Sequence, residues 1–148
     1  MANQLFTSMH ISAAGMTAQR SRMDIVAENI ANAEATRTEE GGPYRRRQVV
    51  FQTVPSGQKF SEVFRGSMSK GAFQSVKVAE VTQDKSPFRD VYDPAHPDAD
   101  ANGMVKLPNV NAVTEMVDMN SAARSFEANV SVMEASKRMF MKSLELLR

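Results

Sequence analysis

The chain has 148 residues and 42% hydrophobic content, so its length fits one domain, or a small domain with appendages, and full disorder is excluded. An aromatic content of 7% without tryptophan argues against a large compact core, and the net charge of +1 argues against strong general attraction to nucleic acid or anionic lipid. Cysteine is absent, no apolar run is long enough for a transmembrane helix, and the first residues lack the features of a cleaved signal peptide.

Residues 3–33 predict a long amphipathic helix that ends shortly after Asn32. Asn3 is its expected N-cap, and Gly15 destabilises it by about 1 kcal/mol relative to alanine in a helix interior. The methionines of its apolar stripe recur every seven residues, which is the spacing of a coiled-coil seam. The seam residues of this helix are Leu5, Met9, Met16, Met23 and Ile30.

The middle of the chain predicts a small β element joined by extended loops. Gly41, Gly42 and Pro43 cannot continue a helix. Alternating and β-branched residues predict two strands, followed by two short extended pieces that flank a tight turn at 101–104. These strands are expected within 44–54, 72–82, 88–92 and 105–107. Residues 58–70 carry no pattern from which a structure follows.

The last stretch, residues 109–148, predicts a second and longer amphipathic helix. No glycine or proline interrupts it after Ala112, and Lys137 is the one charged residue in its apolar stripe. Charged residues occupy the opposite face, so only one stripe is suited to burial. The seam residues of this helix are Met116, Met119, Phe126, Val130, Met133, Phe140, Leu144 and Leu147.

These elements predict a mainly α fold with a β insertion, in which two long terminal helices pair as an antiparallel coiled-coil hairpin. The expected segments are an N-terminal coiled-coil helix (1–34), a central β-rich insertion (35–108) and a C-terminal coiled-coil helix (109–148). Two helices alone leave much of both stripes in water, and each buried Met, Leu or Phe is worth roughly 1.5–3 kcal/mol. We therefore expect copies of the chain to assemble, and we expect frayed terminal helices in an isolated monomer.

Two clusters could carry chemistry, but both have a simpler interpretation. Residues 98–103 match the first half of a calcium-binding loop, yet the twelfth position is Asn109 where a bidentate glutamate is needed, which favours an Asx-rich turn. Arg45, Arg46 and Arg47 could bind phosphate, but we expect them to form a solvated strand edge.

Catalysis has no residue set to support it. The two histidines, His10 and His96, have no cysteine to share a metal ion with and no clear order of carboxylate, histidine and serine. No aspartate pair is predicted to be buried enough for a raised pKa. The sequence therefore predicts no catalytic residue, metal site or cofactor, and a protein that is not an enzyme.

Asn29 and Asn32, followed by Thr36, and several longer segments of the chain resemble motifs of bacterial flagellar axial proteins. The Asn-x-x-Asn signature of that group is matched by Asn29 and Asn32, followed by Thr36, and the continuation to Pro43 and Tyr44 resembles the proximal-rod branch of the FlgC type. Further matching segments are 92–103, 107–111, 115–119 and 125–130. The likeness covers nearly the whole chain and is loosest at 52–72. One departure is the pair at 34–35, where the family more often has a small polar residue before threonine.

The resemblance implies a structural subunit of the flagellar basal-body rod, a helical tube that crosses the periplasm, encloses the export channel and transmits torque. It also implies paired terminal helices inside the tube, type III secretion without a cleaved signal, and as partners the chain's own copies, neighbouring rod proteins and the export apparatus. Neither nucleic acid nor membrane insertion is expected. The alternatives are a soluble coiled-coil adaptor or chaperone that binds a partner helix, and a calcium-dependent enzyme or sensor.

Overall fold

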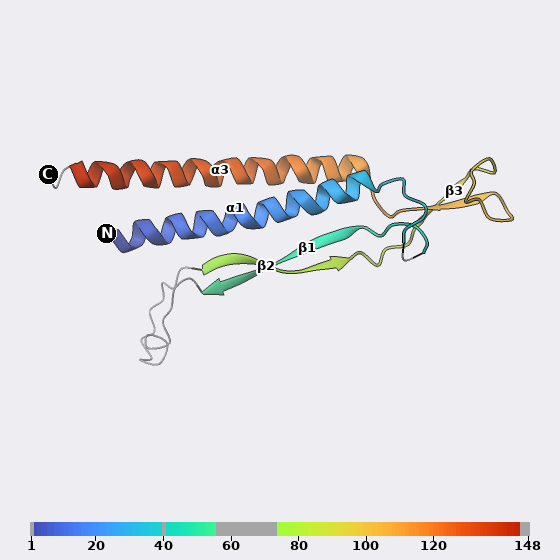
Figure 1. Cartoon of the computed structure of the whole chain (residues 1–148), viewed down its shortest axis with the longest axis horizontal. Helices are drawn as coiled ribbons and strands as arrows, with labels where there is room; N and C mark the ends of the chain where they lie inside the picture. The colour runs from blue at the N-terminus through green and yellow to red at the C-terminus, as the bar shows by residue number, and fades with distance from the viewer. Residues whose placement is uncertain (1, 40, 56–73, 146–148) are drawn as a thin grey trace, which may run out of the picture. The chain divides into compact units, whose positions relative to one another are not determined.

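A computed structural model describes residues 2–39, 41–55 and 74–145, without the side chains of 2–5 and 55. A helix lies at each end of the chain and short strands lie between them in sequence (Figure 1). In chain order, the elements are α1 (Ala2–Ala31), β1 (Arg47–Pro55), β2 (Gln74–Gln83), β3 (Arg89–Tyr92), β4 (Met104–Leu107) and α3 (Ala112–Glu145). The prediction of two terminal helices with small β elements between them is confirmed. The unassigned segment 58–70, Leu147 and the side chain of Leu5 lie outside the described residues.

Helix α1 ends next to Asn32, whose side-chain amide bonds to the helix backbone. The Asn32 Nδ2 donates to the Glu28 carbonyl oxygen (2.9 Å), and the helix ends at Ala31. Beyond it, Gly41 and Gly42 have φ angles of 84° and 86°, in the left-handed region that favours glycine. The predicted end of this helix is confirmed. The predicted N-cap is wrong, because α1 already begins at Ala2 and Asn3 lies inside it.

Helix α3 begins at an asparagine cap. The Asn111 Oδ1 accepts hydrogen bonds from the backbone N–H groups of Val113 (3.0 Å) and Thr114 (3.2 Å), which have no partner inside the helix. Pro108 precedes this cap and is buried. From Ala112 the helix continues to Glu145 without interruption, as the absence of glycine and proline predicts.

The strands form two separate two-stranded sheets, where the sequence predicted a single β element. Strand β1 pairs with β2, and β3 pairs antiparallel with β4, with Arg89 opposite Leu107 and Tyr92 opposite Met104. The predicted tight turn between β3 and β4 contains Gly103, whose φ angle is 73°. A Cβ at this position would lie 3.0 Å from the Tyr92 ring, so both the backbone and the space favour glycine.

The chain divides into two compact units, and each takes a segment from both helices. The first unit comprises Met1–Arg20, Phe51–Ala79 and Ala123–Arg148, and the second comprises Ser21–Val50 and Glu80–Ala122. In the first unit the rings of Phe6 and Phe140 lie 5.5 Å apart, and Ser8 Oγ lies 3.4 Å from Ser136 Oγ. Within this unit, α1 and α3 therefore contact each other.

The same helices also contact each other within the second unit. The Arg22 guanidinium binds the Asp118 carboxylate (2.9 Å), and Asn29 donates to Glu115 (2.9 Å). Within each unit, the contact residue of α3 moves toward the start of α3 as the contact residue of α1 moves toward the end of α1. Within the described residues, neither helix combines the length and apolarity needed to cross a membrane.

The buried side chains of the two helices are mostly small or polar. Among the described residues of α1 and α3 these are Ser12, Ala18, Val26, Asn29, Glu115, Ala122 and Ser136. Glu115, Ala122 and Ser136 lie at multiples of seven residues from one another, on a different helix row from the apolar seam of α3. The helix contacts within each unit therefore use close packing and hydrogen bonds more than apolar burial.

Candidate functional site

The centre of the most buried polar cluster is Asn29, whose side chain is 1% exposed. Its Nδ2 donates to the Arg47 carbonyl oxygen (2.8 Å) and to Glu115 Oε2 (2.9 Å). Its Oδ1 accepts from the Arg47 backbone N–H (2.9 Å) and from the Tyr44 hydroxyl (3.0 Å). A side-chain amide offers two hydrogens and two lone pairs, so every hydrogen-bonding position of Asn29 is used. The amide therefore joins the end of α1 to the start of β1 and to the first turn of α3.

Glu115 is the largest fully buried side chain among the described residues, at 0% exposure. Its Oε1 accepts from Arg46 Nε at 2.7 Å, and its Oε2 accepts from Asn29. The same guanidinium lies 3.7 Å from Asp84 and 3.6 Å from Asp118. A buried carboxylate is tolerated only when it is paired and hydrogen-bonded, and this one has a partner on each oxygen. Removing a single partner is therefore expected to be strongly destabilising.

A second ion pair lies beside this cluster. Arg47 Nη1 binds Glu28 Oε1 at 2.6 Å, and both side chains are partly exposed. Burial, followed by the negative charge of Glu28, raises the pKa of Tyr44 to about 12. The Tyr44 hydroxyl donates a hydrogen bond to Asn29 Oδ1, and the raised pKa extends the pH range in which it keeps its proton.

The three consecutive arginines do not form the expected solvated edge. Arg46 and Arg47 make the ion pairs just described, and the Arg45 guanidinium lies over the Phe88 ring, 4.3 Å from its centroid. All three are half-buried rather than exposed. The prediction was wrong because strand alternation does not reveal partners from distant segments, here the Glu28 and Glu115 carboxylates and the Phe88 ring.

Asn109 fixes the backbone on the other side of Arg46. Its Oδ1 accepts from the Arg46 N–H (2.8 Å), and its Nδ2 donates to the carbonyl oxygens of Asp84 (3.2 Å) and Ser86 (3.3 Å). Hydrogen bonds from the Ser86 hydroxyl and N–H lower the pKa of Asp84. Asn109, first considered as the last position of a calcium loop, thus connects the segment before α3 to the residues that precede and follow the β1–β2 pair.

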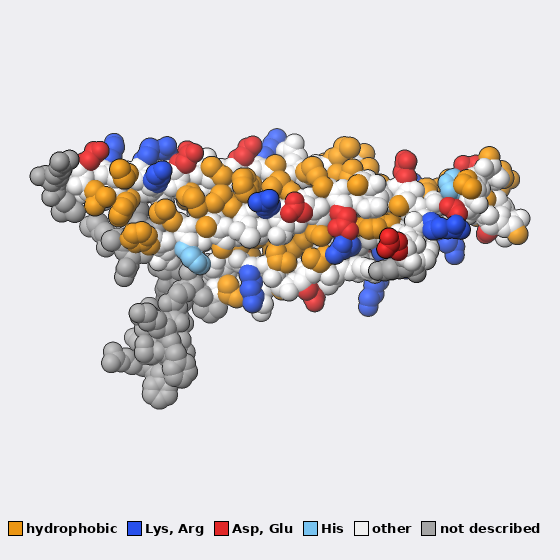
Figure 2. Space-filling model, viewed as in Figure 1, with side chains coloured by type: hydrophobic (Ala, Val, Ile, Leu, Met, Phe, Trp, Pro, Cys, Tyr) orange, Lys and Arg blue, Asp and Glu red, His pale blue; other side chains and the backbone are white. Residues whose placement is uncertain are grey.

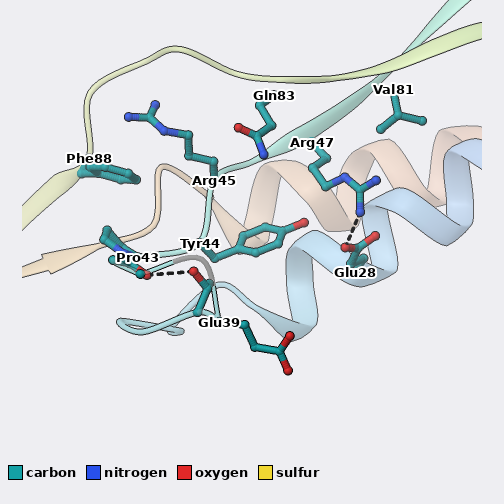
Figure 3. Close-up of a pocket in the computed structure, with 12 residues that line it drawn as sticks. Glu28, Glu39, Pro43, Tyr44, Arg45, Arg47, Val81, Gln83 and Phe88 are labelled. Atoms are coloured by element: carbon teal, nitrogen blue, oxygen red, sulfur yellow. Dashed lines mark hydrogen bonds and ion pairs between the residues drawn. The ribbon is translucent and has the colours of Figure 1, made fainter.

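An open hollow of about 730 Å³ borders this cluster, and its walls include Glu28, Tyr44, Arg47 and Phe88 (Figure 3). Figure 3 shows the Glu28 and Arg47 side chains turned toward each other in their ion pair. Arg45, which also lines the hollow, lies over Phe88. These charged groups are therefore engaged within the chain.

The loop between β3 and β4 is built from Asx turns. Asp100 Oδ1 accepts from the N–H groups of Asn102 (2.8 Å) and Met104 (3.0 Å), and the Met104 and Asn102 hydrogen bonds lower the pKa of Asp100. Asp98 accepts from the Thr36 hydroxyl (2.8 Å) and binds Arg37 (3.2 Å). This is the Asx-rich turn that the sequence favoured, and Thr36 of the family motif helps to hold it.

The two histidines belong to different units of the chain. His10 is exposed on α1, whereas His96 lies in the loop and accepts the Asp98 N–H at Nδ1 (3.0 Å). Within the described ranges, no group of three or more His, Asp or Glu side chains is placed to hold a metal ion.

The remaining predicted site residues are two of the family motif and the described seam residues of the helices. The family-motif residue Asn32 caps the end of α1, while Pro43 is half-buried and lines the hollow. Figure 2 shows hydrophobic side chains at the surface of both helices. Met116 is 58% exposed and Leu144 is 48% exposed. The half-buried seam residues are Met9, Met16, Met23, Ile30, Met119, Phe126, Val130, Met133 and Phe140. No described seam side chain is fully buried.

Comparison with known proteins agrees with the resemblance noted in the motifs. The family model "Flagella basal body rod protein" matches residues 9–37, and "Flagellar basal body rod FlgEFG protein C-terminal" matches residues 101–146. The flagellar basal-body rod protein FlgC of Borreliella burgdorferi is 45% identical, covering 97% of this chain and 98% of the relative. The chain belongs to the FlgC family of flagellar basal-body rod proteins. The FlgC protein of Bacillus subtilis is 47% identical (95% of this chain, 97% of the relative), and that of Escherichia coli O157:H7 is 40% identical (96% and 97%).

Membership in the FlgC family decides between the hypotheses drawn from the sequence. The chain is a structural subunit of the flagellar basal-body rod and not an enzyme, and its place is the flagellar basal body. The adaptor and calcium-sensor hypotheses are set aside. The sequence identified Asn29, Asn32, Thr36 and Tyr44 through the family motif, but nothing in the motif indicates that Asn29 bonds to Tyr44 and to the buried Glu115.

Proposed function

We propose that this FlgC-family chain builds a helical tube with its own copies and with neighbouring rod proteins, and that the tube encloses the export channel and transmits torque. In this proposal, α1 and α3 pair as an antiparallel coiled-coil hairpin. Contacts of Phe6 with Phe140 in one unit and of Asn29 with Glu115 in the other support this direction. The functional segments are then the helix of 1–34, the insertion of 35–108 and the helix of 109–148.

One observation carries the assembly part of the proposal, namely the exposure of the apolar seam. Among the described helix residues, the buried ones are small or polar apart from Val26, while the seam residues stay half-buried or exposed. Covering them against other subunits would gain roughly 25 cal/mol for each Å² of apolar surface. An assembly that extends along a tube uses heterologous contacts, in which the stripe of one copy meets a different surface of the next.

The partners and location follow the same proposal. The chain reaches the periplasm through the flagellar export apparatus without a cleaved signal peptide, and it contacts neither nucleic acid nor the membrane interior. The small number of buried apolar side chains in the described residues and the absence of cysteine in the sequence support passage as an unfolded chain. No cofactor has a role in this assembly.

A charge placed in the seam tests the proposal in cells. Phe126→Asp and Val130→Asp should leave the chain exported but block completion of the basal body, because a carboxylate cannot be buried against a neighbouring subunit without a partner. Export is measured by immunoblotting of secreted or periplasmic fractions, and completion by electron microscopy of isolated basal bodies and by motility.

Ala128→Asp is the matched control, since Ala128 is exposed on the same helix and outside the seam. It should leave both export and motility intact. Normal motility in the Phe126 and Val130 variants would contradict the proposed seam. A failure of export in all three variants would instead point to a general effect of the added charge on secretion.

A further inference from the structure

The apolar seams of the two helices repeat in a way that does not define one alignment. Met9, Met16 and Met23 are the same residue at successive heptads, so sliding α1 by seven residues leaves methionine at two of these three places and an apolar residue at the third. In α3 the corresponding row alternates between methionine and phenylalanine, and methionine adapts readily to irregular neighbours. Such stripes favour pairing but discriminate weakly between alignments that differ by a heptad, about 10.5 Å at 1.5 Å per residue.

The polar row beside the seam differs in this respect. Ser8, Gly15, Arg22 and Asn29 also recur every seven residues, but each has a different partner in α3. Ser8 lies against Ser136. Gly15 lies against Asn129, and a Cβ added to Gly15 would be 3.1 Å from Asn129 Nδ2. A slide by one heptad would exchange all of these partners, so this row contains the positional information that the seam lacks.

Within that row, Asn29 and Glu115 are the buried pair. Both side chains are at most 1% exposed, and the second Glu115 oxygen is held by Arg46, which reaches it from the residue before β1. In an alignment shifted by a heptad, Asn29 and Glu115 would no longer face each other, and an unpaired polar or charged group is costly wherever it stays buried. In coiled coils a single buried polar residue sets the register, because a shift would leave that residue without its partner. The same reasoning applies to the Asn29–Glu115 pair.

We propose that Asn29, Glu115 and Arg46 form a register lock that selects one alignment of α1 against α3 from several that the apolar seams permit. This inference rests on the antiparallel helix pairing of the proposed function. It assigns to the three residues a specificity role that is separate from stability, since apolar replacement of a buried ion pair often preserves stability.

Cysteine cross-linking measures the alignment directly, because the chain contains no cysteine of its own. The S8C/S136C pair reports the observed alignment, in which the two serine Oγ atoms lie 3.4 Å apart. The S8C/S143C pair reports a slide of one heptad, since Ser143 lies seven residues further along α3. Each pair is introduced into the full chain, oxidised at high dilution and resolved on a non-reducing gel, where intrachain and interchain products differ in mobility.

In the otherwise unchanged chain, S8C/S136C should cross-link within the chain and S8C/S143C should not. In the R46M/E115M variant, the S8C/S143C cross-link should rise by roughly tenfold, the factor that corresponds to losing about 1.4 kcal/mol of discrimination. The matched control is E134M/R138M, which makes the same substitutions at an exposed ion pair of α3 and should keep the original alignment.

The outcomes separate the two proposals. Absence of the S8C/S136C cross-link in the unchanged chain would overturn the antiparallel pairing and the lock with it. A folded R46M/E115M variant that cross-links only at S8C/S136C would overturn the lock and leave the pairing intact. If R46M/E115M loses its helical circular dichroism, N29A in the same cysteine backgrounds decides by the same criterion.

Discussion

Tyr44 contributes one hydrogen bond to the buried cluster, and its contribution depends on the proton it carries. The hydroxyl donates to Asn29 Oδ1, which also accepts from the Arg47 N–H. Burial and then Glu28 raise the pKa of Tyr44 from its ordinary value of 10.0 to about 12. The folded chain therefore holds this proton more tightly than the unfolded chain. The resulting stabilisation is complete below pH 10 and is lost as the pH rises towards 12.

Tyr44→Phe removes this hydrogen bond and the titrating group together. At pH 8 the variant should be less stable than the parent by about 1 kcal/mol, because Asn29 keeps its other three hydrogen bonds. Above pH 10 the difference should shrink, since only the parent has a Tyr44 hydroxyl that loses its proton. Urea unfolding of both proteins at pH 8, 10 and 11 measures the gap. A gap that stays constant over this range would show that the Tyr44 proton is not held by the fold.

Single residues also mark the limit of what the sequence could predict about the site. Asn29 was identified because a family motif contains it, but its partners come from positions 44, 47 and 115. Glu115 lies in a stretch that contains exposed apolar residues, so no local pattern indicates that its carboxylate is fully buried. Burial of a charge depends on a partner from elsewhere in the chain, here Arg46, and strand periodicity had assigned that arginine to solvent.

At the scale of elements, heptad spacing predicted both helices and the alternation of residues predicted the strands. The C-terminal end of α1 followed from asparagine chemistry, as Asn32 shows, whereas its predicted N-cap was wrong and the Asn111 cap of α3 was not predicted. What periodicity could not predict is the row by which the helices contact each other within each unit. Hydrophobicity identifies the most apolar row, whereas Ala122 and Ser136 are buried because small side chains permit close approach.

Gly15 illustrates this close approach. The sequence assigned it only a helix-weakening effect, but a Cβ at this position would lie 3.1 Å from Asn129 Nδ2 and 3.2 Å from Asn129 Oδ1. The Asn129 amide is itself held by a hydrogen bond from Nδ2 to the Ser125 carbonyl oxygen (2.9 Å). The glycine therefore makes room for a fixed side chain of the other helix in the same unit.

Gly15→Ala should reveal this contact in a double-mutant cycle with Asn129→Ala. In the Asn129→Ala background the alanine should stabilise the chain by about 1 kcal/mol, the gain in helix propensity. In the parent background this gain should be offset by about 1 kcal/mol, because the Asn129 amide must move away from its hydrogen-bond partner. Chemical unfolding of the four proteins measures the coupling. Equal effects of Gly15→Ala in both backgrounds would rule out the contact as the reason for glycine.

On the scale of the whole molecule, the chain combines buried polar clusters with apolar side chains left at the surface of its helices. Met116, Met139 and Met141 are each more than half exposed, and Val113 and Val117 are exposed as well. A chain with few buried apolar side chains among its described residues has a modest driving force to fold alone. Its remaining apolar surface becomes useful once other subunits cover it, as expected for a rod protein of the FlgC family.

Methionine oxidation can show which of these surfaces assembly covers. In the isolated chain, dilute peroxide should oxidise Met116, Met139 and Met141 at similar rates, since all three are exposed. In assembled basal bodies Met116 should be protected several-fold because it belongs to the proposed seam, whereas Met139 and Met141 lie outside it and serve as internal references. Peptide mass spectrometry after timed oxidation measures each rate. Equal protection of Met116 and Met139 would mean that the subunit contacts extend beyond one stripe, and an unprotected Met116 would remove it from the seam.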